Sequence, residues 1–473
     1  MRVLHITAEC YPAAKVGGLA DVVGAVPKYM SDADVIMPKY GTKWFQGQTT
    51  ETIYKNTFWF PGQTIEFSIQ KIISIDLGFS LFVVDIPGKF DRDGVYGTAD
   101  GYFEDDVERW VCFQRAVLIW LSSIENSYSV LHVHDHHTGL IPFMIKYSYD
   151  YSNLKSLKTV LTIHNLAYQG SFGWDRQYLI AAFDNWKSGL LDWNNRINPL
   201  ASAIRCADWV TTVSPSYLKE LEADAGGLEW IFNNESEKCS GILNGIDSSV
   251  WNRKTDSYLA KLEKRSFKKF KLDNKKALCE TLNINPSNCT ISFIGRLVEQ
   301  KGADILAYAT HQLLQENSDI NILMLGTGDP YLEDQFKLLK EKYPETTGIN
   351  LAYDEGLAHQ IYAGSDFLIM PSRHEPCGLN QLYAMQYGTI PIVNSTGGLI
   401  DSVKDHKTKG GTGIKLTELS VKTVIKAIKE AANIFKDSKL FNQLRANCIA
   451  EDFSWEASTK KYQNIYESLN DRT

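Results

Sequence analysis

The sequence predicts an α/β fold class with two doubly wound parallel-sheet domains in tandem, facing a central cleft. Short apolar runs that suit buried strands are repeatedly followed by a turn and a helix, which is typical of parallel sheets. This rhythm stops near residue 250 and then restarts. A chain of 473 residues is also too long for one core, so we expect two domains with ligands bound in the cleft.

The first domain is expected over residues 1–244. Residues 3–8 are mostly apolar, as in a strand buried on both faces. Lys15, Gly17 and Gly18 follow, and then apolar residues at helical spacing, namely Leu19, Val22, Val23, Val26 and Met30. Glycines at such a turn let backbone N–H groups approach a ligand and Lys15 adds a cation, although an ordinary tight turn would look the same. The spacings of a P-loop and of a dinucleotide fingerprint are both absent.

The remaining elements of this domain follow in order. Aromatic-rich stretches at 54–60 and 79–86 precede a helix at 105–122, and strands are predicted at 131–137 (running into a loop), 158–163 and 208–213. Ser214 and Pro215 then suit the cap and first residue of a helix.

The second domain is expected over residues 245–455. Strands are predicted at 290–294, 321–325, 350–353, 367–371 and 389–393, and the chain from about 420 is helical with no further strand. The segment 251–276 is rich in charge, including Lys261, Lys264, Arg265, Lys268, Lys269 and Lys271. A basic docking patch is conceivable there, but we favour a solvated face or linker.

Polar residues and glycines gather where the predicted strands end. They are Lys15, His164, Arg296, Lys301 and Glu375, with Gly17, Gly18, Gly378, Gly397 and Gly398. Arg296, Lys301 and the helix N-termini would neutralise a diphosphate without a metal. Glu375 would then face a hydroxyl-bearing group or a developing positive charge. A nucleotide diphosphate sugar meets both demands, because its diphosphate leaves as its sugar carbon becomes oxocarbenium-like.

Composition excludes several classes of partner and location. Lys and Arg number 49 against 56 Asp and Glu, and this net charge of −7 argues against a nucleic-acid partner. No apolar run approaches membrane-spanning length, so we expect no membrane partner. Because residues 3–8 lack a basic leader and a cleavage site, we expect no secretory signal and a cytoplasmic location. The eight cysteines are scattered without a CxxC pair, which favours reduced thiols.

Three other chemistries fit parts of the sequence. Four histidines, His132, His134, His136 and His137, approach a metallo-hydrolase pattern. Asp135 stands one place too early for it, so we favour structural or acceptor-side histidines and no metal. Cys377 beside His374 lacks an orienting third group for a thiol nucleophile. A glycosidase would need a second carboxylate to accompany Glu375, and none stands out in a comparable motif.

Glu9 and seven blocks of sequence resemble bacterial glycogen and starch synthases, in the order in which that family has them. The blocks are 15–22 (KVGGLADV), 132–135 (HVHD), 162–170 (TIHNLAYQG), 243–247 (LNGID), 295–302 (GRLVEQKG), 371–379 (PSRHEPCGL) and 395–399 (STGGL). The resemblance runs from residue 1 to about 455, and the combination of K-x-G-G-L with E-P-C-G-L is highly specific. Departures are the segment 29–38, which is several residues shorter than usual, the trimmed segment after Gly398, and His374, where phenylalanine is common.

This resemblance implies a retaining glycosyltransferase of the GT-B type. The fold would be two Rossmann-like domains, 1–244 on the acceptor side and 245–455 for the nucleotide sugar, with a last helix, 456–473, crossing back to the first. The reaction would transfer glucose from ADP-glucose to the non-reducing end of an α-1,4-glucan, without a metal or other cofactor. The implied partners are therefore a nucleotide-sugar donor and an α-1,4-glucan acceptor.

The resemblance also implies roles for single residues. The catalytic residues would be Glu375, His164, Arg296 and Lys301. The substrate-binding residues would be Lys15, Gly17, Gly18, Asp21, Asp135, Asn244, Tyr353, Gly378, Leu379, Gly397 and Gly398. Within these sets Arg296 and Lys301 hold the diphosphate, Tyr353 stacks on the base, and Glu375 supports the sugar cation without forming a covalent bond. His164, Asp135 and Asn244 line the glucose and acceptor side.

Three rival functions remain open. They are the same transfer from UDP-glucose, a nucleotide-sugar epimerase, and a non-catalytic glucan-binding protein. No motif determines the base of the donor. Because glucan binding alone requires no phosphate cations, the combination of Lys15, Arg296, Lys301 and Glu375 favours a transferase over a binding protein.

Overall fold

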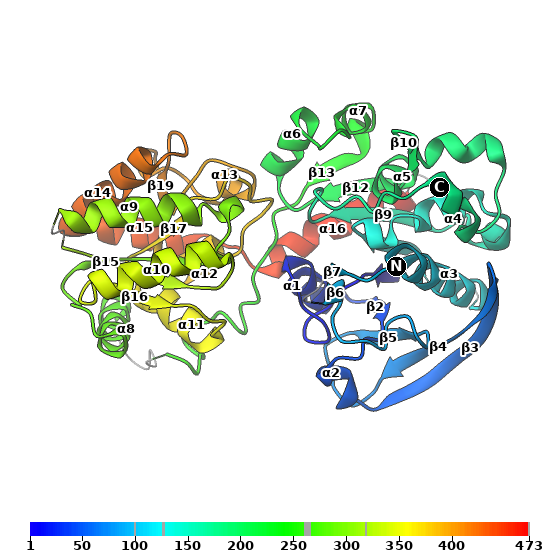
Figure 1. Cartoon of the computed structure of the whole chain (residues 1–473), viewed down its shortest axis with the longest axis horizontal. Helices are drawn as coiled ribbons and strands as arrows, with labels where there is room; N and C mark the ends of the chain where they lie inside the picture. Colours follow the sequence, from blue (N-terminus) through cyan, green and yellow to red (C-terminus); the bar gives the residue numbers. More distant parts are fainter. Residues whose placement is uncertain (99–100, 125–127, 260–265, 317–318, 472–473) are drawn as a thin grey trace. The chain divides into compact units, whose positions relative to one another are not determined.

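The chain forms two compact units (Figure 1). The structure, a computed structural model, describes residues 1–98, 101–124, 128–259, 266–316 and 319–471. Unit 1 comprises Met1–Val213, Leu218–Ile242 and Ser458–Thr473, and unit 2 comprises Ser214–Tyr217 and Leu243–Ala457. Most of the C-terminal helix therefore belongs to unit 1, although the chain reaches it only after completing unit 2.

A nine-stranded sheet in the order β13-β12-β9-β8-β1-β2-β5-β4-β3 forms the centre of unit 1. Its strands are β1 (Val3–Ile6), β2 (Ala33–Pro38), β3 (Thr50–Phe60), β4 (Gln63–Ile72), β5 (Ser80–Asp85), β8 (Val130–His134), β9 (Lys158–Ile163), β12 (Trp209–Thr212) and β13 (Cys239–Gly241). From β13 to β5 all neighbours are parallel. Every residue of β1 and β8 is buried, which explains why these strands appear in the sequence as largely apolar runs, interrupted only by His5, His132 and His134.

Helices surround this sheet (Figure 1). They are α1 (Gly18–Ala25), α2 (Lys43–Gln46), α3 (Asp106–Ser123), α4 (Ile141–Tyr147), α5 (Pro199–Cys206), α6 (Pro215–Ala223), α7 (Glu229–Asn234) and α16 (Trp455–Asn470). Two small hairpins, β6 (Gly97–Thr98) with β7 (Gly101–Tyr102) and β10 (Asp192–Trp193) with β11 (Arg196–Ile197), lie outside the main sheet. The predicted cap of α6 is confirmed, because Oγ of Ser214 accepts a hydrogen bond from the Tyr217 N–H at 3.2 Å.

Unit 2 is built on a six-stranded, wholly parallel sheet in the order β16-β15-β14-β17-β18-β19. Its strands are β14 (Cys289–Ile294), β15 (Ile320–Leu325), β16 (Thr347–Asn350), β17 (Phe367–Met370), β18 (Ile390–Val393) and β19 (Ile414–Lys415). Its helices are α8 (Phe267–Leu282), α9 (Ala303–Gln315), α10 (Pro330–Lys342), α11 (Glu355–Gly364), α12 (Asn380–Gln386), α13 (Gly398–Ser402), α14 (Val421–Lys436) and α15 (Ser438–Ala450).

Three sequence predictions are wrong in detail. The strand expected at 350–353 is β16, which lies three residues earlier and begins with the weakly apolar pair Thr347 and Gly348. The first helix ends at Ala25 and continues as a 3-10 turn, because Pro27 has no N–H to donate. The sheet of unit 1 is not wholly parallel, since β3 and β4 form an antiparallel hairpin at one edge.

The charged segment 251–276 also differs from the expected solvated face or linker. Lys261, Lys264 and Arg265 lie outside the described residues, and Lys268 and Lys269 are exposed. Lys271 is buried, however, and its Nζ donates to the Ser365 carbonyl at 2.8 Å and to Oγ1 of Thr389 at 2.7 Å. The inner side of α8 is therefore part of the core of unit 2, and its buried ammonium group is satisfied by residues about a hundred positions away.

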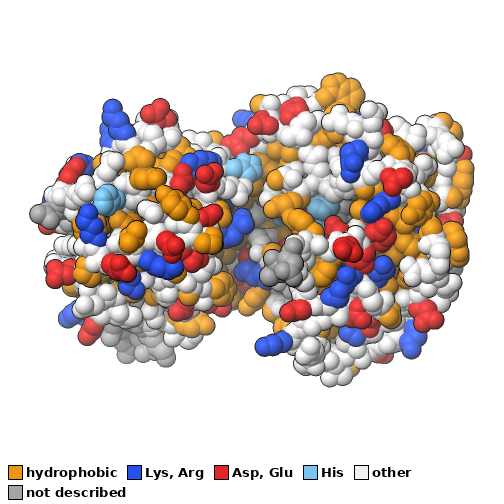
Figure 2. Space-filling view, in the orientation of Figure 1, with side chains coloured by type: hydrophobic (Ala, Val, Ile, Leu, Met, Phe, Trp, Pro, Cys, Tyr) orange, Lys and Arg blue, Asp and Glu red, His pale blue; other side chains and the backbone are white. Residues whose placement is uncertain are grey.

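The distribution of surface charge and the state of the cysteines agree with what the composition predicts. On the face shown in Figure 2, basic and acidic side chains are interspersed. All eight cysteines are free thiols, and seven of them are buried. Within the described ranges, no helix has the length and apolar character needed to cross a membrane.

Candidate active site

The loops that follow β14, β17 and β18 carry predicted catalytic and substrate-binding residues of unit 2. These three strands are parallel neighbours, so their carboxyl ends meet at one edge of the sheet. Lys301 follows β14, Glu375 follows β17, and Gly397 and Gly398 follow β18. The topology therefore brings together residues that are far apart in the sequence.

Lys301 and Glu375 form a direct ion pair. The Nζ of Lys301 lies 2.8 Å from Oε1 and 2.6 Å from Oε2 of Glu375, and Oγ of Ser372 donates to Oε2 at 2.9 Å. Glu375 is only 6% exposed. A cation and a hydroxyl thus hold the carboxylate in one orientation, which is the preorganisation that electrostatic catalysis requires.

Gly397 and Gly398 allow the loop after β18 to lie directly against the loop that holds Glu375. The N–H of Gly398 donates to the carbonyls of Glu375 and Pro376, at 3.1 and 3.2 Å. A Cβ on Gly397 would lie 2.1 Å from the Glu375 carbonyl oxygen, and one on Gly398 would lie 2.3 Å from that of Cys377. The sequence suggested that these glycines open a helix toward an anion, whereas in the structure they make close backbone packing and the Gly398 N–H is already engaged.

Polar side chains that the sequence analysis did not single out hold the same loops. Arg373 makes two hydrogen bonds of 2.7 Å to the carboxylate of Asp304, and its N–H donates to the Gln300 carbonyl at 2.9 Å. These contacts tie the Glu375 loop to the turn that carries Lys301. Nδ2 of Asn380 donates to the last carbonyl of β14, that of Ile294, at 2.6 Å. Arg373 lies in a matched block and Asn380 directly follows it, but their partners could not be read from the sequence.

Within the described ranges, the other predicted residues of unit 2 make no hydrogen bond to the side chains of Lys301 and Glu375. Arg296 is exposed, and its side chain makes no hydrogen bond or ion pair with the part of the chain that the structure describes. Tyr353, 85% exposed, follows β16 at the opposite side of β14 from β17. Gly378 has a φ of 73°, and Leu379 is half-buried against the core of unit 2.

Asn244 and Cys377 lie together in unit 2. Asn244 is buried and belongs to unit 2, and its backbone N–H favours the charged form of the Cys377 thiol in the E-P-C-G-L block. Burial and the nearby Glu375 carboxylate raise the pKa of the Cys377 thiol to about 12. A thiol that stays protonated at neutral pH is a poor nucleophile, which removes that alternative.

In unit 1 the side chain of Glu9 holds the K-x-G-G-L loop through hydrogen bonds to its backbone. Oε2 of this buried carboxylate accepts the N–H groups of Val16 at 2.5 Å and Gly17 at 2.9 Å, and its other oxygen accepts the hydroxyl of Tyr96. The Gly17 N–H is therefore engaged within the protein. The space above Gly17 and Gly18 is nevertheless open, since a Cβ at either would meet nothing within 4 Å.

Lys15 and Asp21 lie on the open side of this loop. The Nζ of Lys15 is 2.7 Å from Oδ1 of Asp21 and 5.5 Å from the centre of the Tyr11 ring. Both charged side chains are partly exposed. The pair couples the loop to the first turn of α1, because Asp21 belongs to that helix.

Asp135 and His164 follow the neighbouring strands β8 and β9. Oδ1 of Asp135 accepts the His164 N–H at 2.7 Å, and Asp135 itself adopts a left-handed φ of 56°. Burial raises the pKa of the Asp135 carboxyl to about 7, even though the N–H groups of His164 and Asn165 favour its charged form. The structure therefore joins these two predicted residues through a backbone contact, with the His164 ring left for other partners.

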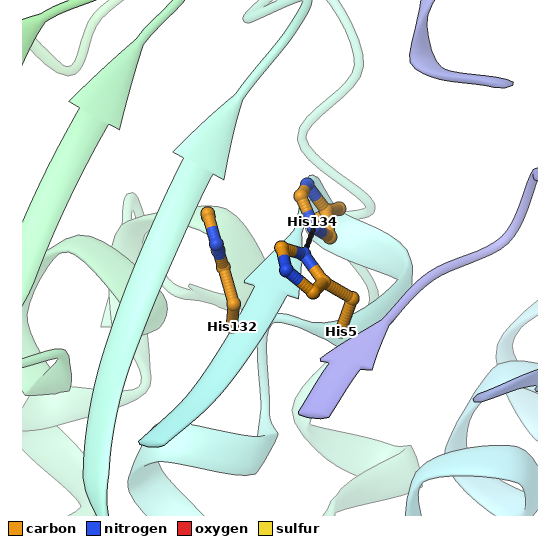
Figure 3. A group of neighbouring side chains, drawn as sticks. All are labelled: His5, His132 and His134. Carbon is orange, nitrogen blue, oxygen red and sulfur yellow. Dashed lines mark hydrogen bonds between the residues drawn. The ribbon is translucent and has the colours of Figure 1, made fainter. Parts of the chain in front are cut away.

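The clustered histidines engage one another and neighbouring hydroxyls. His5, His132 and His134 lie on adjacent strands β1 and β8 (Figure 3), with one nitrogen of each within 4.8 Å of the others. Both nitrogens of His132 and both of His134 are already in hydrogen bonds of 2.6–3.1 Å. A metal ion would have to displace those bonds, so the arrangement fits a hydrogen-bonding network better than a metal centre.

Comparison with known proteins identifies the family of this chain. The family model described as "Starch synthase catalytic domain" matches residues 2–234, and "Glycosyl transferases group 1" matches residues 274–449. The glycogen synthase of Flavobacterium johnsoniae is 46% identical over 472 residues, 98% of each chain, and that of Alkaliphilus metalliredigens is 36% identical over 99% of this chain and 100% of its own. The catalytic domain of starch synthase IV from Arabidopsis thaliana, bound to ADP and acarbose, superimposes with a TM-score of 0.86 at 30% identity, covering 99% of each chain. Sucrose-phosphate synthase from Thermosynechococcus elongatus, at 17% identity and a TM-score of 0.60, shares the fold.

The two parallel-sheet units and the matched family models define a glycosyltransferase of the GT-B fold, and specifically a hexosyltransferase. Within that class the chain belongs to the glycogen synthase family, which uses a nucleotide-sugar donor and a glucan acceptor to transfer glucosyl units. The fold and the family that the sequence blocks implied are thereby confirmed.

Proposed function

We propose that this chain transfers glucose from ADP-glucose to the non-reducing end of an α-1,4-glucan with retention of configuration. The ion pair of Lys301 and Glu375 carries the proposal. A leaving diphosphate gains negative charge while the sugar carbon gains positive charge, and this pair presents one complementary charge for each. Both interactions strengthen as the bond stretches, which is the condition for lowering the barrier.

On the leaving-group side, we assign Lys301 and the exposed Arg296 to the diphosphate. Lys301 shares its ammonium protons between Glu375 and the phosphate oxygens, because an ammonium group has three donors. Arg296 follows β14 with its guanidinium unengaged in the described chain, and guanidinium groups bind phosphate oxygens in pairs. Gly378, Leu379, Gly397 and Gly398 shape the backbone around the same group.

On the sugar side, we assign Glu375 to the oxocarbenium-like carbon and Asp135, Asn244 and His164 to the glucose and acceptor. The acceptor hydroxyl attacks from the face that the diphosphate leaves, so its proton passes to the departing phosphate oxygen. The new bond then keeps the configuration of the old one, and Glu375 forms no covalent bond.

The nucleotide is assigned with help from a relative. The Arabidopsis starch synthase IV domain, 30% identical over 99% of the chain, binds ADP. Tyr353 is exposed at a strand end and suits stacking on an adenine ring. Lys15 and Asp21, with the open backbone at Gly17 and Gly18, are assigned to the nucleotide sugar.

The test is incorporation of labelled glucose into a glycogen primer, with ADP-glucose and UDP-glucose supplied in separate reactions. We expect label in the polymer from ADP-glucose, released by an enzyme that cleaves α-1,4 bonds from non-reducing ends. Faster incorporation from UDP-glucose would replace the donor in the proposal. An isomerised donor would indicate an epimerase, and glucan binding without either product would indicate a binding protein.

A further inference from the structure

Three histidine rings form a hydrogen-bonded chain inside unit 1. Nδ1 of His5 lies 3.1 Å from Nε2 of His134, and Nδ1 of His134 lies 3.0 Å from Nε2 of His164. His5 and His134 are about 1% exposed, whereas His164 is half-buried. This chain of three histidines therefore starts in the core, at His5, and ends at His164, the residue assigned to the sugar.

Each ring in the chain is neutral. Burial lowers the pKa of His5 and of His164 to about 3, and burial together with the neighbouring histidines lowers the pKa of His134 well below its ordinary value. A neutral imidazole has one N–H and one bare nitrogen. His134, which is bonded on both sides, must donate to one neighbour and accept from the other, so all protons in the chain point the same way.

The inner end of the chain selects the direction. Nε2 of His5 is buried and has no partner in the described part of the chain. If His164 donated inward, His5 would carry its proton on this atom, as an orphaned N–H in the core. If His5 donates outward, the orphan is a bare nitrogen. Buried N–H groups without a partner are the rarer and costlier case, so the outward direction is favoured.

His132 does not take part in the hydrogen bonds of these three histidines, because both of its ring nitrogens are bonded to other residues. Oγ1 of Thr211 donates to the Leu161 carbonyl, so it accepts from Oγ1 of Thr162 at 2.5 Å. Thr162 must then accept from Nε2 of His132, at 2.6 Å. Nδ1 of His132 is left to accept from the Tyr466 hydroxyl on α16, also at 2.6 Å. His132 donates its one ring proton to Thr162, so it has none to donate to His5 or His134.

We propose that His5 and His134 are positioning residues that hold His164 as its Nδ1–H tautomer, so that His164 donates a neutral hydrogen bond to an oxygen of the transferred sugar. With Nε2 occupied by His134, Nδ1 is the nitrogen that His164 has left, and it has no partner among the described residues. A neutral donor binds a sugar oxygen without adding a second positive charge beside an oxocarbenium-like carbon. The hydrogen bond to the sugar rests on the proposed glucosyl transfer, whereas the tautomer of His164 does not depend on it.

The tautomer can be measured on the unmodified protein. Long-range ¹⁵N–¹H correlation spectra of ¹⁵N-histidine-labelled protein separate Nδ1–H from Nε2–H rings, and the His164→Gln variant assigns the signal. We expect His164 as Nδ1–H and His132 as Nε2–H without any donor present. A proton on Nε2 of His164 would overturn the proposal, whatever sugar nucleotide the enzyme uses.

Kinetics test the consequence. His134→Phe removes the donor that fixes His164, and we expect kcat/KM for ADP-glucose to fall about twofold or more while inhibition by ADP is unchanged, because the competent tautomer is then only one of two. His134→Asn keeps an N–H near the former Nδ1 and should restore most of the loss. His132→Asn, at an equally buried site on the same strand, is the control that should leave the His164 tautomer unchanged. Wild-type activity in His134→Phe, or no rescue by His134→Asn, would refute the positioning role.

Discussion

At the scale of residues, Glu375 and Lys301 were expected to act on different parts of the donor, yet the structure binds them to each other. The carboxylate of Glu375 reduces the net positive charge that Lys301 presents to a diphosphate. The ammonium group of Lys301, in turn, fixes the orientation of the Glu375 carboxylate. Of substitutions at the two positions, only those of Lys301 should therefore weaken the binding of ADP.

Glu375→Ala should lower turnover at least about a hundredfold, the size of effect seen when one electrostatic stabiliser is removed. The Kd for ADP should stay equal or become smaller, because Lys301 is then released toward the phosphates. Glu375→Gln keeps an acceptor for Ser372 but lacks the charge, so its turnover should also fall. Steady-state kinetics with calorimetric titration of ADP provides both numbers. Turnover within a few-fold of wild type in either variant would exclude Glu375 from the chemistry.

Lys301→Ala should weaken ADP binding about 10- to 100-fold, since a charge-assisted hydrogen bond contributes roughly 1.5–3 kcal/mol. Lys337→Ala, on an exposed position of α10, removes the same unit of charge and should leave the affinity unchanged. Calorimetry at one fixed ionic strength compares the two. Equal ADP affinity in Lys301→Ala and wild type would show that the ammonium group does not meet the diphosphate.

Asp135 should make the stability of unit 1 depend on pH. Its pKa is raised to about 7 in the folded chain, so its contribution to stability is complete below about pH 4 and is lost as the pH rises through 7. Asp135→Asn keeps Oδ1 as acceptor for the His164 N–H but does not titrate. We expect the variant to gain about 3 to 4 kcal/mol relative to wild type between pH 4 and pH 8, measured by urea unfolding. Parallel pH curves for the two proteins would contradict this.

At the scale of elements, close approach between loops decides the geometry of the site in unit 2. Gly302, the N-cap of α9, has a φ of 71°, and a Cβ there would lie 2.0 Å from the Pro371 carbonyl oxygen. Pro371 begins the loop that bears Ser372 and Glu375. The turn after β14 and the loop after β17 can thus hold Lys301 and Glu375 in contact only while residue 302 lacks a side chain.

Gly302→Ala should therefore reduce both stability and turnover. Gly410→Ala is a matched control, because Gly410 has a similar φ of 75° but nothing within 4 Å of an added Cβ. Both variants should lose about 1–2 kcal/mol from left-handed strain, and Gly302→Ala should lose more because the Pro371 loop must move. Only Gly302→Ala should lower kcat, by about tenfold or more. Equal kcat values in the two variants would show that the contact does not control the ion pair.

At the scale of the whole molecule, the last helix returns to the first unit. Tyr462 and Tyr466 of α16 are almost fully buried, and the hydroxyl of Tyr466 forms a hydrogen bond with His132 of β8. Unit 1 is therefore completed only by residues at the end of the chain. Its stability should depend on that helix in a way that the stability of unit 2 does not.

Tyr466→Ala should destabilise unit 1 by about 3–5 kcal/mol, because the lost ring leaves a cavity and Nδ1 of His132 loses its hydrogen-bond donor. Asn464→Ala, on the exposed side of the same helix, should change stability by less than about 0.5 kcal/mol. Hydrogen exchange followed by mass spectrometry reports each unit separately. We expect faster exchange in β8 and β9 of Tyr466→Ala and unchanged exchange in β14 and β17. A uniform change in both units would contradict the assignment of α16 to unit 1.

The sequence alone determined the features that depend on neighbouring residues. The strand at 158–163 was located to the residue, because Val160, Leu161 and Ile163 with two β-branched threonines suit a strand that is buried on both faces. The cap at Ser214 was readable for the same kind of local reason. β16 was misplaced because Thr347 and Gly348 leave no continuous apolar run, and the hairpin of β3 and β4 was missed because much of β3 is exposed.

Only the tertiary structure decided which charges and protons meet. Lys271 appeared to be one more surface lysine until its acceptors, Ser365 and Thr389, were known. The pairing of Lys301 with Glu375 and the direction of the histidine chain are of the same kind. Hydrogen bonds and ion pairs act over about 3 Å in space, and the fold places partners at that distance from positions tens to hundreds of residues apart. No local pattern in the chain contains that information.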